Sequence, residues 1–157
     1  LDLSSLPSAA PGIGVQGRFR LDRLSLGLYG VWLPAQSVYV RADQFVDFGL
    51  LLAGARACAR AFSGPLSGDA CAGFELGNLH AEGSGLSESR SVDNLWLAPS
   101  GALELQARLT RAFGATLRAE GLWPLVRRPY RVNDAETVHR PPIFGARLYL
   151  GASWFVD

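Results

Sequence analysis

Apolar and polar residues alternate along most of this chain. The alternation is clearest in five segments, 13–22, 24–32, 96–110, 116–125 and 144–156. Successive side chains of a β-strand point to opposite faces, so a period of two predicts strands with one apolar face and one polar or small face. A period of two, and not the helical period of 3.6, dominates the chain. The sequence therefore predicts an all-β fold.

Two less regular strands, at about 46–61 and 67–78, carry residues that can pair with each other when the strands are aligned antiparallel. When they fold back on each other, Cys58 lies opposite Cys71, and the same register opposes an arginine to an aspartate. Directly opposed residues approach to about 4.5–5.5 Å, a separation that a disulfide can bridge. We predict a hairpin with a Cys58–Cys71 disulfide, and two buried free thiols are the alternative.

The strands are joined by short and long connections in turn. The segment Leu1–Leu6 has the pattern of one more strand, cut short, which makes eight. The long connections are Pro34–Gln44, Leu79–Asn94 and Arg127–Pro142. In an up-and-down meander this order places the short turns at one end and the long loops at the other. We predict one domain, residues 1–157, that forms an eight-stranded antiparallel barrel with a truncated first strand.

Composition narrows the classes of function. A net charge of +1 excludes a strongly basic nucleic-acid binder. No run of about 18 apolar residues occurs, so a membrane-spanning helix is excluded. Only 18% of residues are charged, and the polar faces of the strands carry small residues with a few charges of both signs. Such faces suit the narrow interior of an eight-stranded barrel, while the apolar faces suit contact with lipid.

Two sets of residues fit a barrel that crosses a membrane. Trp32, Trp123 and Trp154 lie toward strand ends, where aromatic girdles mark the membrane interface. Buried charges are costly unless paired, so the charges on facing strands are predicted to form an interior salt-bridge network that closes the lumen. Its predicted members are Glu104, Arg108, Arg118 and Glu120.

The chain resembles the small eight-stranded outer-membrane β-barrels of bacteria, the group typified by the transmembrane domain of outer membrane protein A. The resemblance rests on the two-residue repeat, the alternation of short and long connections, and the final strand 144–155. The chain departs from that group by ending Phe155-Val156-Asp157 instead of on an aromatic residue. The run of residues in segments 96–102 and 119–126 also resembles that of uncharacterised proteins of myxobacteria.

The resemblance implies an outer-membrane location, short periplasmic turns, longer outer loops and a structural or surface-interaction role without a large open pore. Its partners would be outer-membrane lipid and lipopolysaccharide. Arg127, Arg128 and Arg131 follow Trp123 at the loop end of a strand, where their guanidinium groups would meet lipopolysaccharide phosphates. Ordinary rim charges are the alternative reading of this cluster.

Other functions remain open from the sequence. A soluble, lipocalin-like barrel that holds a small apolar ligand has the same alternation with its apolar faces turned inward. A lipid hydrolase at the rim is the second alternative, because His80, Glu82 and Ser84 are spaced to lie on one side of an extended chain. No supporting motif accompanies them, and we expect no enzyme. No metal site and no cofactor are expected, since two His and two Cys lack zinc-ligand spacing.

The short first strand raises a separate question. An open barrel would leave an unpaired strand edge in lipid, which is not viable. Either a truncation or a partner chain accounts for the missing edge, so self-association through the incomplete first strand is left open.

Overall fold

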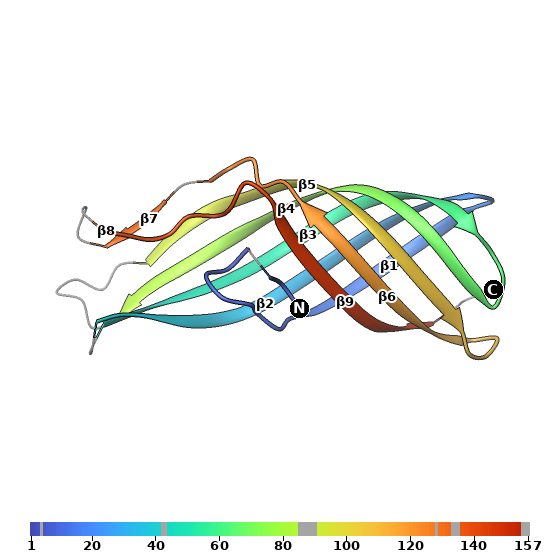
Figure 1. Ribbon diagram of the computed structural model, residues 1–157, viewed down its shortest axis with the longest axis horizontal. Helices are drawn as coiled ribbons and strands as arrows, with labels where there is room; N and C mark the ends of the chain where they lie inside the picture. Colours follow the sequence, from blue (N-terminus) through green and yellow to red (C-terminus); the bar gives the residue numbers. More distant parts are fainter. Residues whose placement is uncertain (4, 42–43, 85–90, 128, 133–135, 155–157) are drawn as a thin grey trace.

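The computed structural model describes residues 1–3, 5–41, 44–84, 91–127, 129–132 and 136–154. The described chain is all-β, and it contains no helix long and apolar enough to cross a membrane. Seven antiparallel strands form one curled up-and-down sheet (Figure 1). In sheet order they are β1 (Ile13–Leu21), β2 (Leu24–Arg41), β3 (Gln44–Phe62), β4 (Leu66–Ser84), β5 (Ser91–Arg108), β6 (Phe113–Leu122) and β9 (Gly145–Trp154).

The prediction of an antiparallel meander is confirmed, but the sheet has seven strands. Of the described residues in the predicted strand Leu1–Leu6, the first three pair along β9, and Asp2 also pairs with Ala10 on its other side. Asp2 forms a bridge with Arg147, and backbone hydrogen bonds join Leu1 to Leu148 and Leu3 to Ala146. The first strand is thus represented by three residues.

The long connections are shorter than the sequence suggested. The predicted loop Pro34–Gln44 is mostly the end of β2, and the predicted loop Leu79–Asn94 consists largely of the ends of β4 and β5. The third, Arg127–Pro142, contains a separate two-stranded hairpin, β7 (Tyr130–Val132) and β8 (Glu136–His139). The strands extend because each remains hydrogen-bonded to its neighbour, as β4 does to β3 up to the pair Phe45–Ser84. These extensions lie opposite the short turns (Figure 1).

The β3–β4 hairpin has the predicted register. Cys58 lies directly opposite Cys71 and Arg60 opposite Asp69. The two sulfur atoms are at disulfide distance, and both side chains face the inside of the curled sheet. The period-two pattern and the cysteine positions were therefore sufficient to align these two strands.

A buried apolar cluster fills the inside of the curled sheet on the side away from the short turns. Leu6 and Ala10, from the segment before β1, are buried within this cluster and pack inside the curled sheet. The inward side chains of β2–β5 that surround them are Tyr29, Val31, Leu33, Val46, Phe48, Leu50, Leu52, Leu79, Ala81, Trp96 and Ala98.

Candidate functional site

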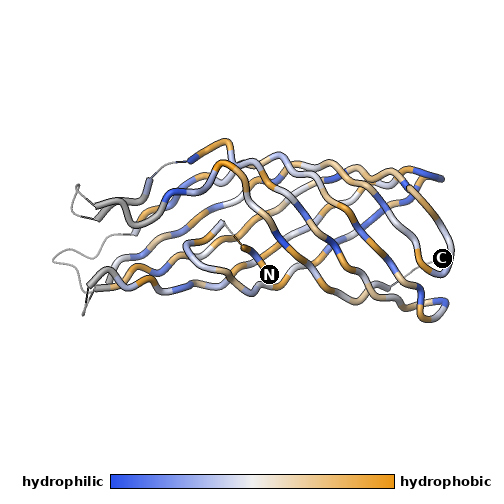
Figure 2. Tube along the Cα trace, in the orientation of Figure 1, coloured by the Kyte–Doolittle hydropathy of each residue, from blue (hydrophilic) through white to orange (hydrophobic). Residues whose placement is uncertain are grey.

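The outer face of the sheet carries a continuous apolar belt. From the short turns as far as Trp32 on β2, Leu51 on β3, Leu76 on β4 and Leu97 on β5, the described outward positions hold only Ala, Gly, Val, Ile, Leu, Pro, Phe or Trp. Large side chains among them are open to the surroundings, with exposed fractions of 80% for Val15, 70% for Leu28 and 85% for Leu150. In Figure 2 apolar residues recur along every strand of this part. Soluble monomers rarely expose a contiguous apolar patch above a few hundred Å², so this belt requires a covering other than water.

Aromatic pairs mark the two borders of the belt on β6 and β9. Near the short turns, the rings of Phe113 and Trp154 stack with centroids 5.7 Å apart. At the other border, Trp123 and Phe144 meet edge to face at 5.3 Å. The borders are ten residues apart on each strand, which is about 33 Å of strand and, at a tilt of about 40°, about 25 Å of height. This matches the apolar band of membrane-spanning barrels, about 25 Å.

Beyond the Trp32 level the two faces of the sheet exchange character. The outward positions past the belt include the polar residues Asp47, Asn78, His80, Glu82 and Asp93, together with the exposed Tyr39 and Leu95. Many of the inward positions at these levels, such as Phe48, Leu50 and Leu79, belong to the buried apolar cluster. Strands β2–β5 have 18 or 19 residues, so at the same tilt they rise about 45 Å and extend about 20 Å past the belt. This extension has polar residues on its outer face and a buried apolar interior, as is typical of a protein surrounded by water.

The lumen inside the belt contains charged side chains. Arg147 and Glu75 form the cluster that lies farther from the short turns, called here the Arg147–Glu75 node. Arg147 donates to Glu75 at 3.0 Å and to Asp2 at 2.7 Å, and all three side chains are buried. The indole N–H of Trp96 donates to the second carboxylate oxygen of Glu75 at 2.6 Å. Arg147 also donates to Ser5 at 3.1 Å. This node ties the start of the chain to β4, β5 and β9.

A second ionic network lies closer to the short turns. Arg18 bridges Asp69 at 2.9 Å and Glu104 at 2.6 Å, and Arg60 contacts Asp69 at 2.8 Å. Arg118 lies 3.9 Å from Glu104. These contacts join β1, β3, β4, β5 and β6 across the lumen.

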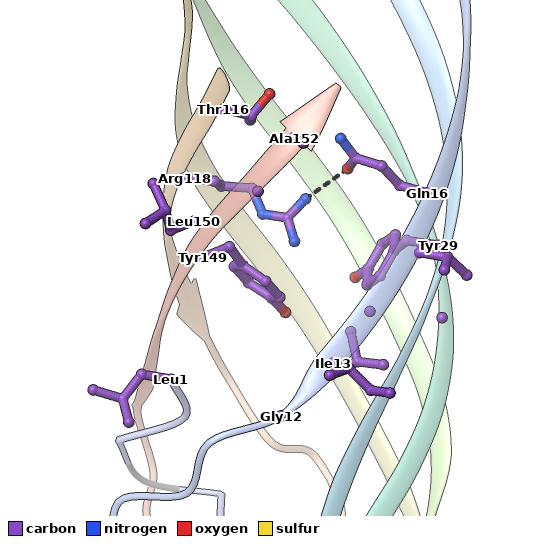
Figure 3. Close-up of a pocket in the computed structure, with 15 residues that line it drawn as sticks. Leu1, Gly12, Ile13, Gln16, Tyr29, Thr116, Arg118, Tyr149, Leu150 and Ala152 are labelled. Carbon is purple, nitrogen blue, oxygen red and sulfur yellow. Dashed lines mark hydrogen bonds between the residues drawn. The ribbon is translucent and has the colours of Figure 1, made fainter. Parts of the chain in front are cut away.

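Stacked arginine and tyrosine side chains cross the lumen between these networks. The guanidinium of Arg56 lies 4.0 Å from the ring centre of Tyr29, and that of Arg118 lies 3.7 Å from the ring centre of Tyr149. Arg118 is also 5.7 Å from Tyr29 and donates a hydrogen bond to Gln16 at 2.9 Å (Figure 3). Cation–π contacts of this kind are favourable where water is scarce. Together, these side chains obstruct the lumen.

The predicted interior network is only partly assembled as the sequence suggested. Glu104, Arg118 and Glu120 are buried in the lumen, and Glu104 lies opposite Arg118 in the strand register. The shortest ionic contact of Glu104 is nevertheless with Arg18, and Arg108 is an exposed residue near the short turns. The sequence places Arg147 and Glu75 on the polar faces of their strands, but it did not identify them as members of the network.

The predicted interface residues occupy different settings. Trp32, Trp123 and Trp154 all point outward, with exposed fractions of 52%, 47% and 74%. Arg127 lies just past Trp123 and donates to the backbone carbonyl of Pro141 at 3.0 Å. Arg128 lies outside the described residues, and so does the side chain of Arg131.

A polar cluster on the outer face of the extension contains the predicted histidine. His80 Nδ1 is 2.8 Å from Asp93 Oδ1, and His80 Nε2 is 3.9 Å from a carboxylate oxygen of Glu82. Hydrogen bonds from His80 and Asn78 lower the pKa of Asp93. The side chain of Ser84 lies outside the described residues. Carboxylates therefore face both nitrogens of the imidazole ring.

Among the described residues, no cluster of three or more His, Cys, Asp or Glu side chains is arranged to hold a metal ion. Comparison of the chain with protein-family models, with curated proteins and with solved structures finds no match. The functional interpretation consequently rests on the belt and the lumen.

Proposed function

We propose that this protein is an integral eight-stranded β-barrel of a bacterial outer membrane, with a structural or surface-interaction role and without catalysis. The observation that carries the proposal is the apolar belt, about 25 Å tall between its aromatic borders, that surrounds a charged lumen. Lipid covers such an outside, and the paired charges inside are shielded from it. A soluble barrel for an apolar ligand would need the opposite arrangement at this level.

The continuous strand pairing from β1 through β6 to β9 supports the same location. In a bilayer every backbone N–H and C=O must be satisfied within the protein, which an antiparallel barrel achieves through its strand pairs. The disulfide of the β3–β4 hairpin fits an oxidising compartment such as the periplasm. In the orientation that we propose, the short turns face the periplasm, and the extension of β2–β5 faces the outside of the cell.

The filled lumen supports a role other than bulk transport. The Arg147–Glu75 node, the Arg18 network and the stacked Arg56 and Arg118 occupy the interior of the belt. Side chains commonly fill barrels of this size. We expect no steady conductance of porin size in planar bilayers, and such a conductance would overturn this part of the proposal.

Binding of partners is assigned to the extension of β2–β5 past the belt and to the rim of the sheet. The outward polar positions past the belt and the β7–β8 hairpin offer surface on a rigid scaffold, where binding residues commonly lie. At the rim, Arg127, Arg128 and Arg131 would contact lipopolysaccharide phosphates. Replacement of all three by Gln is expected to lower the affinity for lipopolysaccharide, and an unchanged affinity would remove this assignment.

The proposal is tested by folding the protein into detergent micelles and lipid vesicles and running gels with and without boiling. A closed barrel resists the gel detergent until boiled, so we expect a faster band that shifts on boiling and a folded fraction that stays with the vesicles. A folded, monodisperse protein in plain buffer, with no shift and no vesicle binding, would contradict the proposal and favour the soluble barrel.

A further inference from the structure

The sheet has an open seam where its two outermost strands should meet. In the described part of the chain β1 pairs only with β2, and β9 pairs with β6 and with the residues at the chain start. Leu1 and Leu148 exchange both of their backbone hydrogen bonds, at 2.6 and 2.9 Å. Past this point, toward the short turns, the edges of β9 and β1 face each other unpaired.

A cavity of about 480 Å³ lies along this seam (Figure 3). Residues of β1 and β9 line its two sides, and Leu1 stands at one end. Glycines on or next to the two edge strands leave the backbone of both edges accessible, namely Gly12 and Gly14 at β1 and Gly151 on β9. The polar side chains at its inner wall are Gln16, Thr116, Arg118 and Tyr149. The space is therefore bordered by unpaired strand edges and by polar lumen groups.

Strand direction determines what fits the seam. Strands β1 and β9 both run toward the short turns, because β2 and β6 run away from them. A single strand that runs away from the short turns would be antiparallel to both edges. A second copy in the same membrane orientation would bring β9 beside β1 in parallel, unlike every pair in the sheet. Leu1–Leu3 already run in the required direction, bonded to β9.

We propose that the seam is a strand-acceptor site, and that its occupant is an extended segment joined to the amino end of Leu1. The inference rests on the proposed membrane location, since unpaired edges are excluded from lipid. Strands that span such a membrane have about 9–11 residues, of which Leu1–Leu3 supply three, so the segment contributes about six to eight. It completes an antiparallel ladder with β9 on one side and β1 on the other.

The existing pairs also fix the register and the chemistry of this segment. Leu1 opposes Leu148 and Asp2 opposes Arg147, so the second position before Leu1 opposes Leu150 and the fourth opposes Ala152. Both positions face outward and require apolar residues. The first and third positions face the lumen, and they require small or polar residues. Hydrogen-bonded pairs alternate along an antiparallel ladder, so the amides of Leu150, Ala152 and Trp154 are those that the segment would cover.

The test compares the 157-residue chain with two fusions in micelles. The first fusion adds eight residues before Leu1, with Val or Leu at the even positions and Ser or Thr at the odd positions. The second is identical except for Pro at the second and fourth positions, which removes the N–H groups that would bond to β9. Hydrogen exchange of the amides of Leu150, Ala152 and Trp154 is the measurement, and the gel shift on boiling reports barrel formation.

We expect the first fusion to slow exchange of these three amides by at least about tenfold, on the order expected for one added hydrogen bond each, and the proline fusion to leave them fast. Equal exchange in all three chains would overturn the inference, as would amides that are already protected in the 157-residue chain. If the gel shift persists while protection fails, only the strand-acceptor site is refuted. If no chain shows the gel shift, the membrane proposal fails as well.

Discussion

The substitution Leu117→Arg probes the apolar belt at its middle. Leu117 lies on the outward face of β6, four residues from Phe113 and six from Trp123. In the register of the sheet it is flanked by Leu105 and Leu150, which also face outward. No acidic residue is available on the described outward face of the belt to pair with a new cation. For the proposed membrane location, the position therefore isolates the cost of a charge in contact with lipid.

The expected cost follows from this depth. Arginine on the lipid face costs about 2–4 kcal/mol at the midplane of a membrane barrel and about 0–1 kcal/mol near the interface. The folding equilibrium constant should fall roughly 30- to 700-fold, because about 1.4 kcal/mol is a factor of ten. Glu82→Arg is the matched control, since Glu82 faces outward on β4 but lies past the belt. It should change the free energy of unfolding by less than about 1 kcal/mol.

Both variants are measured by equilibrium denaturant unfolding in lipid vesicles, followed by tryptophan fluorescence. The account requires a large loss for Leu117→Arg and a small change for Glu82→Arg. If the two substitutions have the same effect, or if Leu117→Arg is neutral as at a water-exposed surface, the assignment of this face to lipid is refuted.

Three further predictions concern the lumen, the hairpin and the extension. Glu75→Gln leaves Arg147 without its β4 partner, and we expect a loss of about 3 kcal/mol in vesicle unfolding because a buried ion pair is broken; an unchanged midpoint would contradict this. Reduction of the hairpin disulfide, whose cysteines are 13 positions apart, should lower the free energy of unfolding by about 3 kcal/mol, and equal midpoints with and without reductant would contradict the stabilising role. Because the pKa of Asp93 is depressed by His80 and Asn78, its contribution to stability is present above the unfolded pKa and is lost as the pH falls through the folded pKa. In an NMR titration, His80→Ala should move the Asp93 midpoint up toward its ordinary value of 3.8, and an unmoved midpoint would exclude the contact.

The parts of the fold that the sequence predicted are those governed by neighbouring residues. Alternation over ten or more residues reports which side chains share a face, and this information is local. The hairpin of Cys58 and Cys71 was accessible for the same reason, because one short turn and one pair of cysteines fix its register. The outward placement of Trp32, Trp123 and Trp154 follows from the same parity.

The length of β2–β5 was missed because the alternation changes its sense. In the first part of β4 the even positions are apolar, as at Phe74 and Leu76, whereas further along they are polar, as at His80 and Glu82. The odd residues of this second part are apolar and buried. The composition there is typical of a loop. In the proposed membrane location, however, a strand that passes from lipid into water exchanges its apolar and polar faces. The switch of apolar residues from even to odd positions along β4 could therefore have predicted the longer strand.

The contacts of the lumen could not be predicted because they depend on how the whole sheet curls. Arg147 is 72 positions from Glu75 and 145 positions from Asp2. Asp2 lies directly opposite Arg147, but the two residues do not belong to one hairpin. Arg18 likewise reaches Glu104 across the lumen. Inward parity identifies the candidates, while the partner of each charge is set by the curvature of the whole sheet.

The central claim is that the belt between the two aromatic borders is covered by lipid. Quenching of tryptophan fluorescence by lipids brominated at different depths tests it most directly, with four variants that each retain one of Trp32, Trp96, Trp123 and Trp154. The account predicts strong quenching by shallow bromines for the three outward tryptophans and little for Trp96, which is 1% exposed inside the sheet. Absence of quenching at the three outward tryptophans would contradict the account.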